Sequence, residues 1–210
     1  QDKPYSIIGH SMGCLVALYT MVDFSLRAEQ LILISPFLGV PTSPFIEPRL
    51  TLITRALVLI GLGNMRLRKR THNTGRFEDN RCTHSRHHYN KNRQHPCYLP
   101  LEPTFRWLHA SLLAIEQCFK PQKLQHLAKA SRVRILSGSD DTIINLKAIQ
   151  RWTNLALEAG IAVEHSSIEG SYHELLCEED SIYRSAKTRI ENWLRASRRE
   201  QEATIKELAM

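Results

Sequence analysis

A serine flanked by glycines stands near the start of the chain, in the run Gly9-His10-Ser11-Met12-Gly13. A short apolar stretch typical of a buried strand, Pro4 to Ile8, precedes this run. An apolar stretch with the length of a helix, Cys14 to Phe24, follows it. A serine on such a strand-to-helix turn has an exposed Oγ and a strained backbone, which is the geometry of a nucleophile in acyl transfer. We therefore predict that Ser11 is a nucleophile.

The surroundings of this serine would complete the reaction centre. Side chains at the positions of Gly9 and Gly13 would collide with the neighbouring strand or helix, so the pattern favours glycine there. The start of the following helix directs free N–H groups and the positive end of its dipole at the serine. We expect the backbone N–H of Met12 to be an oxyanion donor. A five-residue pattern also occurs by chance. Acid and base residues elsewhere in the chain therefore decide whether Ser11 is a nucleophile.

Candidate partners of the serine follow two later strands. The pair Asp140-Asp141 comes shortly after the predicted strand Val133 to Leu136. His173 comes shortly after the predicted strand Val163 to Ile168. The carboxyl ends of parallel strands expose functional groups at one edge of a sheet, so these residues are expected to meet there. Their chain order is serine, acid, histidine, as a triad on this kind of sheet requires.

Each partner has a predicted role. His173 would take the proton of Ser11 as general base and later protonate the leaving alcohol, while an aspartate orients its ring. The alternatives are a surface-loop histidine and aspartates that cap the next helix. We prefer Asp141 as the acid, with Asp140 as the alternate, because the apolar pair Ile143-Ile144 would turn the loop after Asp141 back against the core.

The order of elements predicts an α/β fold with a parallel sheet. Strand, helix and strand alternate over residues 1–36, and the alternation resumes after residue 120. A long amphipathic helix then runs from about Ser181 to Arg198 and towards Met210. Residues 37–119 contain helical stretches and no convincing buried strand. We therefore predict a sheet domain in two pieces, residues 1–36 and 120–210, with a helical cap or lid over residues 37–119.

The motifs together resemble the lipase branch of the α/β-hydrolases, and specifically the bacterial lysophospholipase L2 and monoacylglycerol lipase group. The motifs that carry the resemblance are Gly9–Gly13, Gly138–Asp141 and Ile168–Leu176. Within the predicted cap, Thr83–Arg86 with Tyr89, and then Thr104–Leu108, resemble the cap of lysophospholipase L2. The likeness extends over nearly the whole chain.

This resemblance implies an α/β-hydrolase fold and hydrolysis of the acyl ester of a lysophospholipid through an acyl-serine on Ser11. Monoacylglycerol hydrolysis is the alternative activity. The group needs no metal and no cofactor. Its members carry several strands before the nucleophile strand and an upstream loop with a second oxyanion N–H, so we expect the fold to be N-terminally incomplete before Gln1. Cys14 departs from the small residue, glycine, that often stands at this position, and a thiol should be tolerated.

The chain is basic, with a net charge of +7 and a sequence pI of about 9.3. Nine Lys/Arg, five His and two acids fall between Arg66 and His95. We expect this segment to contact phosphate headgroups or an anionic membrane, beside an acyl-binding wall in the apolar stretch 50–62. Aromatic residues are sparse in it, and no nucleic-acid module is visible. A catalytically inactive, basic phospholipid-binding module is the alternative function.

The cysteines and histidines of the chain could form disulfides or bind a metal. Five scattered cysteines without C-x-x-C spacing favour a reducing compartment, so we expect a cytoplasmic protein, peripheral at the inner membrane. A zinc cluster is the alternative for six residues: Cys82, His84, His87, His88, His95 and Cys97. Their spacing matches no closed zinc-finger pattern, so we expect no metal. Hydrophobic residues at 42% exclude a disordered chain.

Overall fold

A four-stranded parallel sheet forms the centre of the protein. The computed structural model describes residues 5–24, 28–42, 46, 49–67, 76–96, 102–128 and 132–208. The strands are β1 (Ser6–His10), β2 (Gln30–Ile34), β3 (Arg132–Gly138) and β4 (Val163–Ile168), in the spatial order β1-β2-β3-β4. Every neighbouring pair is parallel, so the predicted α/β class and parallel sheet are confirmed.

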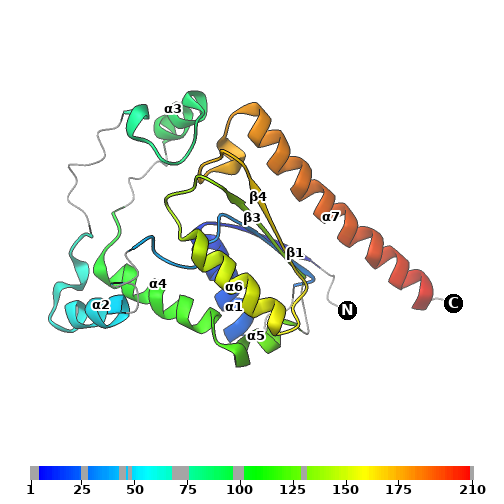
Figure 1. Cartoon of the computed structure of the whole chain (residues 1–210), viewed down its shortest axis with the longest axis horizontal. Coiled ribbons are helices and arrows are strands. Elements are labelled where there is room, and N and C mark those ends of the chain that lie inside the picture. The colour runs from blue at the N-terminus through cyan, green and yellow to red at the C-terminus, as the bar shows by residue number, and fades with distance from the viewer. Residues whose placement is uncertain are drawn as a thin grey trace.

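Helices cover both faces of this sheet (Figure 1). The α-helices are α1 (Met12–Asp23), α2 (Leu50–Leu59), α3 (Arg86–Gln94), α4 (Phe105–Cys118), α5 (Pro121–Ala128), α6 (Leu146–Glu158) and α7 (Asp180–Leu208). Short 3-10 turns are η2 (Leu62–Asn64), η4 (Phe77–Asp79) and η5 (Leu175–Cys177). Helices α1, α4, α5 and α6 contribute to the core on one face, and α7 packs on the other. No described helix combines the length and the apolar character needed to cross a bilayer.

Strand β2 explains why two separate cores form. All five of its residues are buried, because the strand is central and its side chains alternate between the two faces. Leu31 and Leu33 pack with α1 and α6, whereas Ile32 and Ile34 pack under α7. On β1, by contrast, Ile8 is half exposed on the α7 face. The continuous apolar run of β2 is thus the sequence signature of a strand covered on both sides.

A buried tryptophan links α6 to the end of α4. Trp152 is fully buried, and its Nε1 donates a hydrogen bond to the backbone carbonyl of Cys118 at 3.0 Å. Ile115 and Cys118 lie in the same core cluster as the strands. The carboxyl-terminal part of α4 therefore packs with the sheet, although residues 37–119 were predicted as a cap.

Two helices were not predicted from the sequence. Helix α3 has almost no apolar residues, and it begins where the Ser85 side chain accepts a hydrogen bond from the backbone N–H of His88 at 3.3 Å. Helix α5 begins with Pro121, which fits the first turn because its missing N–H would have no partner there. A capping serine marks the start of α3 and a first-turn proline marks that of α5, so the apolar spacing of the sequence does not predict them.

The end of β3 lies directly against the loop that follows β4. The backbone N–H of Asp140 donates to the carbonyl of Ser171 at 3.0 Å, and Ser139 N–H donates to the carbonyl of Ile168 at 3.0 Å. A Cβ atom at Gly138 would lie 2.3 Å from the carbonyl oxygen of Ser171 and 2.5 Å from that of Tyr172. Only a glycine lets these two loops approach so closely.

We expect Gly138→Ala to destabilise the protein by about 3 kcal/mol, because a backbone carbonyl has no rotamer that would relieve the overlap. Gly13→Ala is the matched control. No described atom lies within 4 Å of a Cβ at that helical position, and alanine favours a helix over glycine by about 1 kcal/mol. Urea unfolding measures both free energies. Equal unfolding midpoints for the two variants would contradict this account of the β3 end.

Candidate active site

Three segments that are far apart in sequence meet at the carboxyl edge of the sheet. Ser11 follows β1, Asp141 follows β3, and His173 follows β4. The Oγ of Ser11 lies 2.9 Å from Nε2 of His173. The Nδ1 of His173 lies 2.7 Å from Oδ2 of Asp141. The arrangement is a continuous chain of hydrogen bonds from a hydroxyl through an imidazole to a buried carboxylate.

Ser11 has a strained backbone. Its φ is 51° and its ψ is −117°, between the last residue of β1 and the first residue of α1. A non-glycine residue in such a region costs about 1–3 kcal/mol, so surrounding contacts must hold it. The Ser11 N–H donates to the carbonyl of Ile34 at 2.9 Å, and the Ser11 carbonyl accepts from Phe37 N–H at 3.2 Å. The sharp, strained turn predicted for the serine is confirmed.

The two glycines that flank the serine differ in their surroundings. A Cβ at Gly9 would lie 3.0 Å from both the N and the Cα of Cys14, so strand and helix pass close together there as predicted. At Gly13, no described atom lies within 4 Å of such a Cβ, so the collision predicted for that position is wrong. Gly13 lies on the outer side of the first helical turn and is exposed.

Cys14, which stands where a glycine is often found, fits into the core. The side chain is fully buried, and its Sγ donates to the carbonyl of Ile34 at 3.3 Å. Burial raises the pKa of the Cys14 thiol to about 12, so it stays protonated and acts as a small apolar group. The four described cysteines, which exclude Cys97, are all free thiols.

Of the two candidate carboxylates, Asp141 is the one that contacts the histidine. Its side chain is buried, and its Oδ1 accepts from the backbone N–H of Ile143 at 2.9 Å while Oδ2 faces His173. Asp140 is exposed and accepts from the hydroxyl of Ser139 at 2.7 Å. Neither aspartate caps α6, because Asn145 accepts from the N–H of Ala148 and takes that place.

Two further side chains contact the backbone carbonyl of His173. Ser35, which follows β2 and has a φ of 46°, donates its Oγ to the backbone carbonyl of His173 at 2.8 Å. Nε2 of His10 also lies 3.3 Å from that carbonyl. These contacts escaped prediction, since they join side chains to a backbone atom more than 130 residues away. The only signal for Ser35 is a polar residue directly after a buried strand.

Met12 lies where an oxyanion donor is expected. It is the first residue of α1, so its N–H belongs to the group at a helix start that has no partner within the helix. The acyl oxygen of an ester attacked by Ser11 would approach this N–H and the positive end of the helix dipole.

Potential metal ligands gather at a place that the sequence did not suggest. Among the described residues, the group close enough to hold an ion is His10, His173 and Glu174. It includes no member of the six-residue Cys/His cluster between Cys82 and Cys97. His84 of that cluster instead bonds Glu178 through Nδ1 at 3.0 Å, and Cys97 lies outside the described residues.

The basic segment is partly neutralised by acids. Arg66 pairs with Glu102 at 2.6 Å and Arg86 pairs with Glu78 at 2.7 Å. Residues 68–75 of this segment lie outside the described residues.

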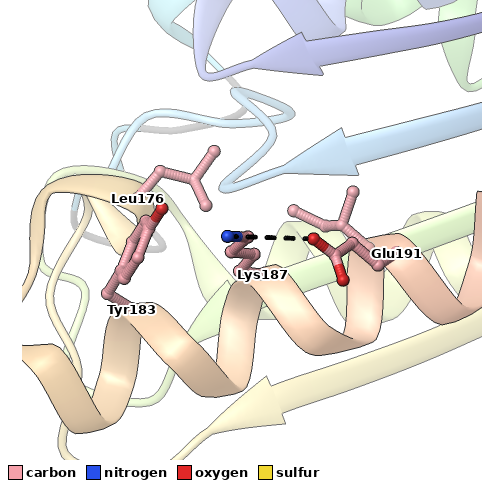
Figure 2. Close-up of a pocket in the computed structure, with 5 residues that line it drawn as sticks. Leu176, Tyr183, Lys187 and Glu191 are labelled. Carbon is pink, nitrogen blue, oxygen red and sulfur yellow. Dashed lines mark ion pairs between the residues drawn. The ribbon is translucent and has the colours of Figure 1, made fainter.

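A pocket of about 350 Å³ lies on the α7 side of the protein. Figure 2 shows its lining, where Lys187 and Glu191 form an ion pair on α7 and Tyr183 and Leu176 face each other across one end. The lining shares no residue with the triad.

Comparison with known proteins places the chain in a family. A family model described as serine aminopeptidase, S33 matches residues 1–180. The chain is 27% identical over 193 residues to a probable lysophospholipase L2 of Haemophilus influenzae, a match that covers 90% of the chain and 58% of that protein. The chain thus spans little more than half the length of this curated relative.

Solved structures agree on the fold. A monoglyceride lipase from Saccharomyces cerevisiae superposes with a TM-score of 0.68 at 18% identity, covering 92% of the chain and 62% of that structure. A monoacylglycerol lipase of Paleococcus ferrophilus gives a TM-score of 0.69 at 16% identity, covering 93% and 69%. The predicted resemblance to the lysophospholipase and monoacylglycerol lipase group is confirmed. The chain belongs to the serine aminopeptidase, S33 family of α/β-hydrolases.

Proposed function

We propose that the protein is a carboxylic ester hydrolase that works through an acyl-serine intermediate on Ser11. The observation that supports this most is the unbroken series of contacts from Ser11 Oγ to His173 Nε2 and from His173 Nδ1 to Asp141. Membership of a family of serine hydrolases supports the same reaction type.

The reaction would take two steps. In the first, Ser11 Oγ attacks the ester carbonyl carbon as His173 Nε2 takes its proton, and the imidazolium then gives that proton to the leaving alcohol. Asp141 holds the ring and stabilises its charge, and the Met12 N–H binds the oxyanion. In the second, water gives its proton to His173 and attacks the acyl-serine, and the fatty acid leaves as Ser11 regains its proton.

The proposed substrate is a lysophospholipid, with monoacylglycerol as the second candidate. The curated relative is named a lysophospholipase, while the two solved neighbours are named for glyceride hydrolysis. The basic segment 66–95 favours the phosphate-bearing substrate, because lysines and arginines near a phosphate-rich surface contribute about 1 kcal/mol each. We propose that residues 37–119 form the cap that meets this substrate, over a sheet domain of residues 1–36 and 120–210.

Helix α2 supports contact between this cap and a lipid surface. One side of α2 packs on α4, where Thr54 Oγ1 lies 3.2 Å from Nδ1 of His109. The opposite side is exposed and apolar except for Arg55, and at its end Leu59 is 75% and Ile60 68% exposed. Figure 1 shows α2 at the edge of the molecule far from β4. Exposed apolar side chains beside a basic segment suit peripheral binding to an anionic membrane.

Ser11→Ala and His173→Ala should each lower kcat by about 10⁶-fold, because the nucleophile and its base act as one unit. The assay is hydrolysis of a short soluble p-nitrophenyl ester, and a serine-reactive phosphonate should label the parent protein and not Ser11→Ala. Ser181→Ala, an exposed serine on α7, is the control and should keep full activity. Substantial hydrolysis by either triad variant would remove the assignment. An unlabelled parent protein would favour the inactive, lipid-binding module instead.

The two aspartates provide an internal comparison. Asp141→Asn should lower kcat by about 10⁴-fold, since the amide favours the wrong tautomer of His173. Asp140→Asn makes the same chemical change at the neighbouring exposed residue and should leave kcat within about 2-fold. Steady-state kinetics with the soluble ester measure both. A larger loss in Asp140→Asn would transfer the role of acid to Asp140.

Substrate choice is tested with two lipids that share one acyl chain. We expect kcat/KM for lysophosphatidylcholine to exceed that for the matching monoacylglycerol by about 10-fold, which corresponds to one or two basic contacts to phosphate. This preference should shrink as salt screens those contacts. Fatty-acid release at low and high ionic strength measures it. A preference for monoacylglycerol at both ionic strengths would identify the neutral lipid as the substrate.

A further inference from the structure

A buried carboxylate lies between the proposed cap and the proposed base. Glu178 directly follows η5, and its side chain has no exposed surface. Its Oε1 accepts from the backbone N–H of Tyr172 at 3.0 Å and from Nδ1 of His84 at 3.0 Å. Its Oε2 accepts from the backbone N–H of His84 at 2.8 Å. One carboxylate thus satisfies donors from two segments that are almost 90 residues apart.

Further contacts reinforce this Glu178 junction, which consists of Thr83, His84, Tyr172 and Glu178. The imidazole of His84 stacks on the ring of Tyr172 with centroids 3.7 Å apart and an interplanar angle of 26°. The hydroxyl of Thr83 donates to the carbonyl of Cys177 at 2.6 Å. The segment that contains His84 therefore contacts the loop between β4 and α7 at Tyr172 as well as at Cys177 and Glu178.

The junction lies next to the histidine of the triad. Tyr172 directly precedes His173, and its N–H belongs to the Ser171–Tyr172 peptide, so Glu178 holds the backbone one residue before that histidine. Ser35 Oγ holds its carbonyl on the other side. Side chains thus hold the backbone on both sides of His173, one from the same loop and one from the residue after β2. Each neighbour of the Glu178 carboxylate named here is a donor, so departure of either segment would leave the buried carboxylate with fewer partners, which is costly.

We propose that Glu178 is a positioning residue that fixes the loop of His173 relative to the segment around His84. The proposed cap and the proposed general base would then move as one unit. The proposal rests on the proposed function of His173 as general base. Glu178 touches no reacting atom. It acts through the Tyr172 peptide, and a small displacement there would lengthen the contact between Nε2 and the Ser11 hydroxyl.

The test replaces Glu178 with glutamine, which has the same shape but presents an NH₂ group to donors. We expect Glu178→Gln to lower kcat for the soluble ester by about 100-fold, as a displacement of about 1 Å would, with KM nearly unchanged. The proton that His173 Nδ1 shares with Asp141 gives a far-downfield NMR signal, and this signal should shift or broaden. Glu179→Gln removes the same charge at the next, exposed residue and should leave both readouts at parent values.

His84→Ala keeps the proposal testable if Glu178→Gln does not fold. It removes the ring stack and one bond to Glu178 but leaves Tyr172 bonded. The same NMR signal should shift, with a smaller loss in kcat of about 10-fold. A folded Glu178→Gln protein, or His84→Ala protein, with the parent signal and the parent kcat would overturn the proposal. If the parent protein hydrolyses no ester, the proposed function fails, and the NMR signal alone decides whether Glu178 positions His173.

Discussion

The hydrogen bond between His173 Nδ1 and Asp141 Oδ2 is the interaction on which the rest of the site depends. It joins loops that follow two neighbouring parallel strands, and both partners are buried, so little water competes for it. The loops can lie close enough only because β3 ends in Gly138, against which the backbone of Ser171 packs. The parallel register of the sheet and one missing side chain together set the position of the imidazole relative to Ser11.

This dependence gives the sheet and the surrounding segments different tasks. The sheet, covered by α1, α4, α5 and α6 on one face and by α7 on the other, fixes where the strand ends lie. The segments between strands then supply side chains that hold single backbone atoms, as Ser35 and Glu178 do around His173. The apolar exposed side of α2 belongs to neither task. Its position at the edge of the molecule suits contact with something outside the chain.

The sequence was informative where function depends on local pattern. The run around Ser11 indicated a strained turn, and the apolar pair after Asp141 indicated which of two carboxylates turns inward. Helices α3 and α5 were missed because capping serine and proline define them more than apolar spacing does. Glu178 was missed for a different reason. Its partner His84 lies 94 residues away, and such pairing has no periodic signature in a single chain. Free space at Gly13 shows that a motif can hold a glycine where packing alone does not require it.

The backbone of Ser11 has an evolutionary consequence. The turn between β1 and α1 imposes a φ of 51° at this position. Every residue with a side chain is strained there, and glycine alone would adopt this conformation without strain. Glycine carries no hydroxyl. Selection for a more stable chain and selection for a nucleophile therefore oppose each other at this single residue. A lineage that no longer needed the hydroxyl would gain stability by drifting to glycine, whereas one that retains serine continues to fold against its own backbone preference.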